Sequence, residues 1–114
     1  MHDEHLRHER AMRACADHCL GCYAACVQTL TQHCLQMGGG HVAPDHVRLM
    51  QSCAELCRAS AAMMLIGSRY HDRLCTLCAE ICTECADDCE RLGDMDACVT
   101  ACRICADSCR EMAA

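Results

Sequence analysis

The sequence predicts an all-α fold, an antiparallel up-down-up-down four-helix bundle with a core lined by cysteine. Two observations lead to this prediction. Cysteines recur in steps of mostly three or four residues, which places them on one face of an α-helix. Glycines divide the 114 residues into four helix-length segments, and no segment shows the period-two alternation of a β-strand. At this length we expect residues 1–114 to form a single domain.

The first two helices are delimited by glycine and proline. The first is predicted over about 3–37 and ends at the glycine triplet 38–40, which is a strong signal for a helix C-terminus. The second begins near Pro44, since proline suits the first turn of a helix, and ends around Gly67. Gly21 lies inside the first helix, where it costs about 1 kcal/mol relative to alanine, and we expect it to allow a close approach between helices.

The last two helices are joined by a short connection. The third is predicted over about 70–92 and ends at Gly93. Asp94 is expected to be the N-cap of the fourth, because its carboxylate can accept hydrogen bonds from free backbone N–H groups in the first turn. That helix continues to Met112. Short connections make consecutive helices antiparallel neighbours.

Cysteine replaces the aliphatic residues that normally fill the inward face of a helix. Leu, Ile, Val and Phe together make up 17 of the 114 residues, which is few for a globular core, so cysteine and alanine must do the packing. The helices therefore point their thiols into one shared interior, which we call the thiol tube. Its predicted metal ligands are Cys15, Cys19, Cys22, Cys26, Cys34, Cys53, Cys57, Cys75, Cys78, Cys82, Cys85, Cys89, Cys98, Cys102, Cys105 and Cys109.

A second, apolar stripe lies one residue along from the thiols. The pattern is consistent with packing between neighbouring helices and equally with a subunit interface. Its members are Leu20, Tyr23, Val27, Leu30, Leu49, Leu56, Met63, Leu74, Leu77 and Ile81.

Composition and charge exclude several classes of function. The formal net charge of −6 disfavours nucleic acid as a partner, because nucleic acid attracts basic surfaces. No run of about 18 apolar residues is present, so we expect no membrane-spanning helix. The chain opens with charged and histidine-rich residues and lacks the apolar segment of an export signal, which favours the cytoplasm. In a reducing cytosol, dense cysteines favour metal binding over disulfides.

The density of thiols predicts a site for soft metal ions. Thiolates, with thioether groups nearby, select Cu(I), Zn(II) or iron–sulfur clusters. Cu(I) fits best, because it accepts two or three thiolates, and cysteines at i and i+4 can hold one ion from a single helix. Zinc requires four ligands from different helices, and an iron–sulfur cluster needs its cysteines in a loop. With bridging thiolates the capacity approaches one Cu(I) per thiol, on the order of ten to sixteen ions.

No arrangement of residues indicates catalysis. An enzyme needs an open coordination position or a nucleophile with a base, and so many identical ligands indicate capacity rather than turnover. We therefore predict copper storage or detoxification without enzymatic activity. Two alternatives remain: a zinc or general soft-metal buffer, and a structural bundle linked by disulfides. Thiols four residues apart on one helix are about 5–6 Å apart at Cβ, too far for a disulfide, so such links would join facing helices.

Two segments carry a resemblance to a known family. CTLCAEICTECADDCERLGDMDACVTACRICADSCREMAA, residues 75–114, and the upstream CADHCLGCYAAC, residues 15–26, resemble the bacterial four-helix-bundle copper storage proteins, in particular their cytosolic branch. The motifs are specific, since few families place cysteine at successive core positions of several helices. The resemblance covers essentially the whole chain. It implies many Cu(I) ions held by core cysteines, a homotetramer, and copper uptake past Met or His side chains at one end of the bundle.

Both ends of the predicted bundle carry candidate uptake ligands. The end with the first and third connections holds His33, Met37, His41, His46, Met50 and Met95, and the opposite end holds His8, Met12, Met64, His71 and Met112. Methionine at a helix end is also common as core filler. We favour the first end, because members of the family cluster His and Met there. Some relatives have a histidine-rich connection before the last helix, whereas RLGDMDAC offers only Met95 as a soft ligand.

Overall fold

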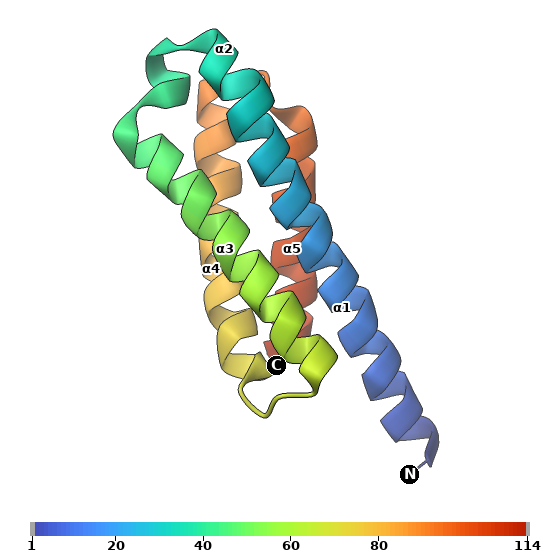
Figure 1. Ribbon diagram of the computed structural model, residues 1–114. Helices are drawn as coiled ribbons and strands as arrows, with labels where there is room; N and C mark the ends of the chain where they lie inside the picture. Colours follow the sequence, from blue (N-terminus) through green and yellow to red (C-terminus); the bar gives the residue numbers. More distant parts are fainter. Residues whose placement is uncertain (1, 114) are drawn as a thin grey trace.

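The computed structural model describes residues 2–113, and over that range it contains four long helices and no strand. These helices are α1 (His2–Thr29), α3 (Pro44–Ile66), α4 (His71–Leu92) and α5 (Asp96–Ala113). They run alternately up and down in a molecule measuring 53 × 20 × 20 Å (Figure 1). The predicted all-α, antiparallel four-helix bundle is confirmed. Across the described residues, no helix combines the length and the apolar character needed to cross a membrane.

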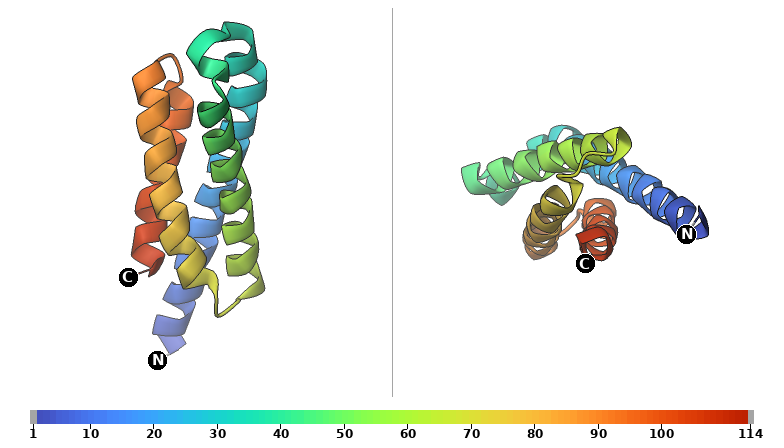
Figure 2. Two further views of the ribbon diagram at one scale, coloured as in Figure 1. Left: turned by 90° about the vertical axis from the view of Figure 1, so that its left-hand side faces the viewer. Right: turned by 90° about the horizontal axis from the view of Figure 1, so that it is seen from below.

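Each long helix contacts two others, so the four enclose a common interior. α1 packs against α3 and α5, and α4 packs against the same two helices. Figure 2 shows α1 and α3 on one side of this interior and α4 and α5 on the other. The first turns of α1 extend beyond the rest of the bundle (Figure 1). Side chains on the inner faces of all four helices therefore meet along one axis.

The predicted first helix reaches Met37, but with one irregular turn. A π-helical turn, η1 (Leu30–Cys34), joins α1 to the short α2 (Leu35–Met37). Cys34 follows Cys26 by eight residues, a step that on a regular α-helix rotates the side chain by about 80° from its starting face, whereas seven residues rotate it by only about 20°. The wider π turn absorbs the extra residue, and Cys34 is fully buried.

The remaining boundaries follow glycine and proline as predicted. Gly38, at φ 68°, ends α2, and a 3₁₀ turn, η2 (Gly39–Val42), leads to α3 with Pro44 in its first turn. Gly67 adopts the left-handed conformation after α3, and its N–H donates to the carbonyl of Met64 at 3.1 Å. Together with the 2.9 Å hydrogen bond from the N–H of Ser68 to the carbonyl of Met63, this bond forms a Schellman-type helix end.

The predicted N-cap of α5 is wrong. α5 begins at Asp96, and the amide of Val99 donates to the carbonyl of Met95 at 3.0 Å, so Met95 is the residue that precedes the helix. Asp94 lies one residue too early and has a φ of 62°. The tight connection after Gly93 needs this left-handed backbone, which aspartate tolerates better than most residues.

Cysteine and alanine form the core. All sixteen cysteines are at most 1% exposed, and the buried alanines accompany them at the helix contacts. Gly21, by contrast, lies on the exposed face of α1, and a Cβ built there would meet nothing within 4 Å. The expected close approach at Gly21 is therefore wrong. In the second stripe, Leu20, Val27 and Leu77 are 40%, 38% and 53% exposed, so packing between helices does not account for all of it.

Candidate metal centre

The sixteen predicted thiols converge in the interior of the bundle. All are free and buried, and Sγ–Sγ contacts of 3.5–3.9 Å join nine of them into a continuous chain along the axis. The chain passes, in order, through Cys15, Cys109, Cys19, Cys105, Cys57, Cys82, Cys53, Cys26 and Cys98. These nine thiols therefore form one connected array of soft donor atoms inside the thiol tube.

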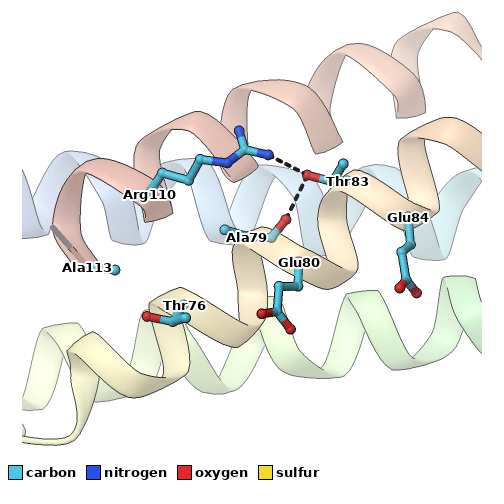
Figure 3. A pocket seen from close by; sticks show the side chains of 7 residues that line it. All are labelled: Thr76, Ala79, Glu80, Thr83, Glu84, Arg110 and Ala113. Atoms are coloured by element: carbon cyan, nitrogen blue, oxygen red, sulfur yellow. Dashed lines mark hydrogen bonds between the residues drawn. The ribbon is translucent and has the colours of Figure 1, made fainter.

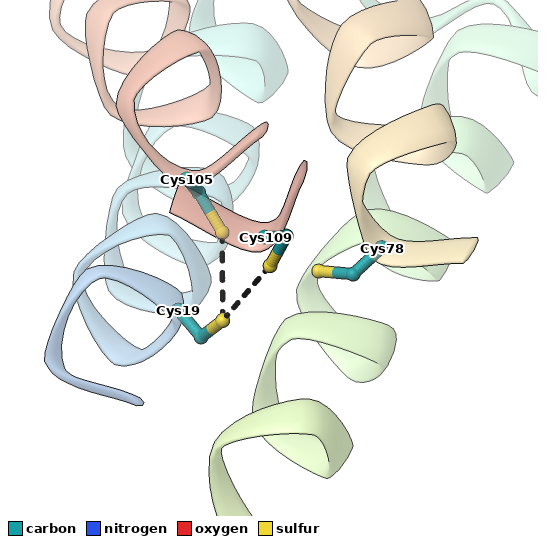
Figure 4. Close-up of side chains that lie close together, drawn as sticks. All are labelled: Cys19, Cys78, Cys105 and Cys109. Carbon is teal, nitrogen blue, oxygen red and sulfur yellow. Dashed lines mark hydrogen bonds between the residues drawn. The ribbon is translucent and has the colours of Figure 1, made fainter. Parts of the chain in front are cut away.

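The thiols gather into groups drawn from different helices. Within each group all Sγ atoms lie within 4.8 Å of one another. Figure 4 shows one of them, in which Cys105 and Cys109 of α5 lie at 3.6 Å from Cys19 of α1, with Cys78 of α4 opposite. The groups are Cys19, Cys78, Cys105 and Cys109; Cys22, Cys57, Cys82 and Cys105; Cys22, Cys26, Cys53 and Cys102; and Cys15, Cys75 and Cys109. Shared members such as Cys105 link one group to the next.

Contacts between helices dominate the tube. Among the sulfur–sulfur hydrogen-bond contacts of residues 2–113, Cys78 and Cys82, 3.8 Å apart, form the one pair that is four residues apart on a single helix. Cys57, for comparison, contacts Cys82 at 3.5 Å and Cys105 at 3.8 Å across the interior. Cys85 and Cys89 are fully buried in the same tube. Sequence reasoning identified the thiols but not these partners, because helix rotation and relative height are set by packing.

Burial and neighbouring thiols shift the pKa of individual cysteines. Burial, with the nearby Cys98, raises the pKa of Cys34. A hydrogen bond with Cys109 acts to lower the pKa of Cys75, but a hydrogen bond with Cys15 and burial raise it to about 12. Cys34 and Cys75, which lie at opposite ends of the tube, therefore carry protons at neutral pH. A metal ion must displace those protons to bind thiolate.

At one end of the tube, mixed soft ligands surround Cys34. We call this end, formed by η1, η2 and the α4–α5 connection, the η2 mouth. The Sγ of Cys34 lies 3.5 Å from Sδ of Met95, 4.0 Å from Sδ of Met50 and 3.7 Å from Nε2 of His46. All four residues are buried. A thiol, two thioethers and an imidazole together suit a soft metal ion.

Asp88 fixes the tautomer of His46. The Oδ2 of Asp88 lies 2.7 Å from Nδ1 of His46, and burial acts to raise the pKa of Asp88, but hydrogen bonds from Arg91 and His46 hold it below its usual value. An ionised carboxylate can only accept, so Nδ1 carries the proton and the lone pair of Nε2 faces Cys34. A carboxylate behind a metal-binding histidine is a common arrangement. Sequence reasoning missed Asp88, since nothing in the pair Asp87–Asp88 shows which carboxylate faces inward.

The other candidates at the η2 mouth lie farther out. His41 is buried and donates from Nε2 to the carbonyl of Gly93 at 3.2 Å, which ties η2 to the α4–α5 connection. Its ring lies 5.6 Å from that of His33. Among the described residues, the buried Nε2 of His33 has no hydrogen-bond partner. Met37 is 50% exposed, so the structure leaves it outside the group around Cys34.

The opposite end carries the remaining candidates. The Sδ of Met64 lies 3.8 Å from Sγ of Cys75, and Met12 is partly buried against the core. The rings of His8 and His71 are 6.0 Å apart. Met112 is partly buried and lines a separate depression with His8. This end thus combines the same donor types as the η2 mouth.

An external groove between α4 and α5 has different chemistry. It has a volume of about 570 Å³ and contains no sulfur or imidazole. Figure 3 shows Arg110 donating to Oγ1 of Thr83 at 2.7 Å across it. The residues lining it are Thr76, Ala79, Glu80, Thr83, Glu84, Arg110 and Ala113. This groove therefore offers no soft ligand for a metal ion.

Comparison with known proteins agrees with this site. The Nmul_A1745 protein from Nitrosospira multiformis is 49% identical, with a TM-score of 0.89 over 91% of this chain and 95% of that chain. The Cu(I)-bound copper storage protein BsCsp3 is 34% identical, with a TM-score of 0.83 over 91% of this chain and 99% of that one. A structure of copper loading to a cytosolic copper storage protein from Streptomyces lividans, with five coppers, is 28% identical, with a TM-score of 0.78 over 93% and 94%.

The family assignment rests on nearly the whole length of the chain. The family model described as copper storage protein matches residues 8–114. That range includes every cysteine of the thiol tube. The predicted resemblance is thereby confirmed, and the chain belongs to the copper storage protein family.

Proposed function

We propose that this protein stores Cu(I) in the cytoplasm, bound by the thiolates of the sixteen tube cysteines. The observation that carries the proposal is the continuous array of free, buried thiols at contact distances of 3.5–3.9 Å. Soft thiolates select Cu(I), and bridging lets neighbouring ions share ligands. The relatives described as Cu(I)-bound and as cytosolic support the ion and the compartment.

We further propose that the protein has no catalytic activity. The thiols are enclosed on all sides by four helices and are at most 1% exposed. Catalytic metal sites keep a coordination position open to substrate, whereas these groups are buried and share thiols with one another. The arrangement suits capacity and protection of the ion from solvent.

Copper uptake is proposed to pass through the η2 mouth. Nε2 of His46 and the Sδ atoms of Met50 and Met95 lie 3.5–4.0 Å from one point, the Sγ of Cys34. Asp88 orients His46 toward that point. His33, His41 and Met37 are proposed as outer ligands, because they lie between this group and the surface.

Residues 1–114 are proposed to act as one storage unit that assembles into a homo-oligomer. The exposed part of the second stripe, Leu20, Val27 and Leu77, supports an interface between copies of the chain. The tetramer implied by family resemblance is the size that we expect. Light scattering of the purified protein measures it directly.

A zinc or general soft-metal buffer is the second candidate, because the structure contains groups of four thiols. Sulfur atoms around tetrahedral zinc, bonded at about 2.3 Å, lie about 3.8 Å apart, and the tube has this spacing. The capacities differ, however. Zinc takes four ligands an ion, so sixteen cysteines hold about four zinc ions when no thiolate is shared between ions.

Titration of reduced apoprotein with Cu(I), in competition with a Cu(I) chelator, tests the proposal. We expect saturation at about ten to sixteen ions per chain, because bridging allows about one ion per thiol. Saturation at four or fewer would overturn the storage function. A parallel zinc titration that gives about four tightly bound ions and outcompetes Cu(I) would establish the buffer instead.

A further inference from the structure

We propose that the end of the bundle opposite the η2 mouth is a second copper port. This α3–α4 end is formed by the N-terminal half of α1, the connection between α3 and α4, and the end of α5. The second port, which rests on the Cu(I) storage function proposed above, is a route by which ions reach or leave the thiol tube without passing Cys34. Its outer ligands are His8, Met12, Met64 and His71, and its inner ligands are Cys15, Cys75 and Cys109.

His71 is held in the tautomer that a metal ligand needs. Its Nδ1 lies 2.8 Å from the backbone carbonyl of Ser68. A carbonyl can only accept, so Nδ1 carries the proton and Nε2 keeps its lone pair. Hydrogen bonding of one ring nitrogen to a carbonyl is a standard way of preparing the other for a metal ion.

Met64 links this histidine to the thiols. It is 4% exposed at the end of α3, and its Sδ lies 3.8 Å from Sγ of Cys75 at the start of α4. Cys75 in turn belongs to the group in which the Sγ atoms of Cys15, Cys75 and Cys109 lie within 4.8 Å of one another. A soft ion at Met64 therefore has thiol ligands directly beneath it.

A pocket opens above Met64. It has a volume of about 570 Å³, and its lining includes His5, His8, Met12, Met64 and His71. His8 on α1 and His71 on α4 face each other across it, with ring centres 6.0 Å apart. Imidazole and thioether donors thus lead from solvent to the buried sulfur of Cys75.

The two ends of the bundle share one design. At the η2 mouth, His46 has Nδ1 bonded to Asp88 and lies beside Cys34 with its thioether neighbours. At the α3–α4 end, His71 has Nδ1 bonded to Ser68 and lies over Met64 and Cys75. Ordinary core packing does not require this set of donors at both ends.

The second port is continuous with the store. Cys15 contacts Cys109 at 3.8 Å, and Cys109 contacts Cys19 at 3.6 Å, so the inner ligands of the port are the first members of the thiol chain. An ion can pass from Met64 into the tube by exchange between neighbouring thiolates. Each exchange forms one Cu–S bond as another breaks, and the proton of the incoming thiol passes to the released thiolate or to water, with no change in oxidation state.

Removal of soft donor atoms from each end separately, and from both ends together, tests the port. Met64→Leu with His71→Gln removes soft donors at the α3–α4 end while conserving volume, and Met50→Leu with Met95→Leu does so at the η2 mouth. Loading is followed as reduced apoprotein takes Cu(I) from its bicinchoninate complex. With two parallel routes, closing the α3–α4 end alone lowers the rate by about twofold or less, but closing it in the η2-mouth variant lowers the rate by at least about tenfold. The proposal fails if the α3–α4 substitutions leave the rate of the η2-mouth variant unchanged.

Controls separate this result from misfolding and from failure of the storage function. Met63→Leu with His18→Gln changes the same residue types at positions that do not line the pocket above Met64 and should leave the rate as it was. In the η2-mouth variant, whose α3–α4 end carries no substitution, one equivalent of Cu(I) should shift the ¹³C-methyl NMR signal of Met64 and leave that of Met63 in place. An unshifted Met64 signal contradicts the port. Saturation of the unsubstituted protein at four or fewer Cu(I) overturns storage and port together, whereas full capacity with unchanged rates overturns the port alone.

Discussion

Replacement of Asp88 by asparagine should weaken Cu(I) binding at the η2 mouth without changing the capacity of the store. Asp88 accepts a 2.7 Å hydrogen bond from Nδ1 of His46, and the two side chains are 22% and 1% exposed, so solvent screens the pair little. Asparagine keeps the size of the side chain but loses the charge. Its amide group can also donate, so the other tautomer of His46, with Nε2 protonated, becomes accessible.

The size of the effect follows from the two kinds of hydrogen bond. A bond to a charged group contributes about 1.5–3 kcal/mol and a neutral bond about 0.5–1.5 kcal/mol. The substitution therefore removes about 1–1.5 kcal/mol of preference for the tautomer whose lone pair faces Cys34. That energy corresponds to about a tenfold loss of Cu(I) affinity at the mouth.

Two measurements check this prediction. Chelator competition with the first equivalent of Cu(I) should show the weaker mouth affinity, while the stoichiometry at saturation stays at the wild-type value. The ¹⁵N shifts of the His46 ring should report the second tautomer. Asp87→Asn is the matched control, because Asp87 is exposed and pairs with Arg103 at 2.9 Å. Equal first-ion affinities for the variants at 87 and 88, or a lower capacity for the latter, would refute the role assigned to Asp88.

Three further predictions concern stability. Copper loading should raise the melting temperature strongly, since each site occupied at a thousandfold excess of free ion over Kd adds about 4 kcal/mol; equal melting temperatures for loaded and apo protein would contradict preferential binding to the native tube. Burial raises the pKa of Cys34. A hydrogen bond with Cys109 acts to lower the pKa of Cys75, but a hydrogen bond with Cys15 and burial raise it from 9.0 to about 12. The folded apoprotein therefore keeps protons that the unfolded chain releases above pH 9, and its free energy of unfolding in urea should fall between pH 9 and 12; a flat profile there would count against the buried thiols. Gly21→Ala should raise the melting temperature of the apoprotein by about 4 °C. This value is the helix propensity gained, about 1 kcal/mol, divided by an unfolding entropy of about 0.24 kcal/mol/K for this length. A lower melting temperature would mean that the added methyl group clashes with a neighbour, whereas a Cβ at this position meets nothing within 4 Å.

The sequence alone predicts the bundle and its thiols because both depend on local rules. Helical spacing places each cysteine on an inward face, and Gly38 and Gly67 end helices by their left-handed backbone. Even the π turn has a signal, the eight-residue step from Cys26 to Cys34, although only the packed structure shows that the chain widens there. These features need no knowledge of which helices are neighbours.

Features that depend on contacts between helices are not predictable in this way. The partners of Cys57, which lie on α4 and α5, depend on how far each helix is rotated and shifted along the axis. Asp88 became part of the η2 mouth because α4 packs beside the start of α3, where His46 lies. The sequence does not distinguish an N-cap at Asp94 from a left-handed turn residue, because aspartate is favoured at both positions.

The cysteine core couples the capacity of the store to the stability of the fold. Cysteine and alanine are short, so four helices approach closely enough for thiols from different helices to lie within 4.8 Å of one another. A leucine at Cys57 would overpack this space, since Cys57 already has sulfur neighbours at 3.5–3.8 Å on two other helices. The same short side chains bury less apolar surface than leucine would, which leaves the apoprotein with a smaller hydrophobic contribution. Metal–thiolate bonds between helices replace that contribution, so the fold should be most stable when the store is full.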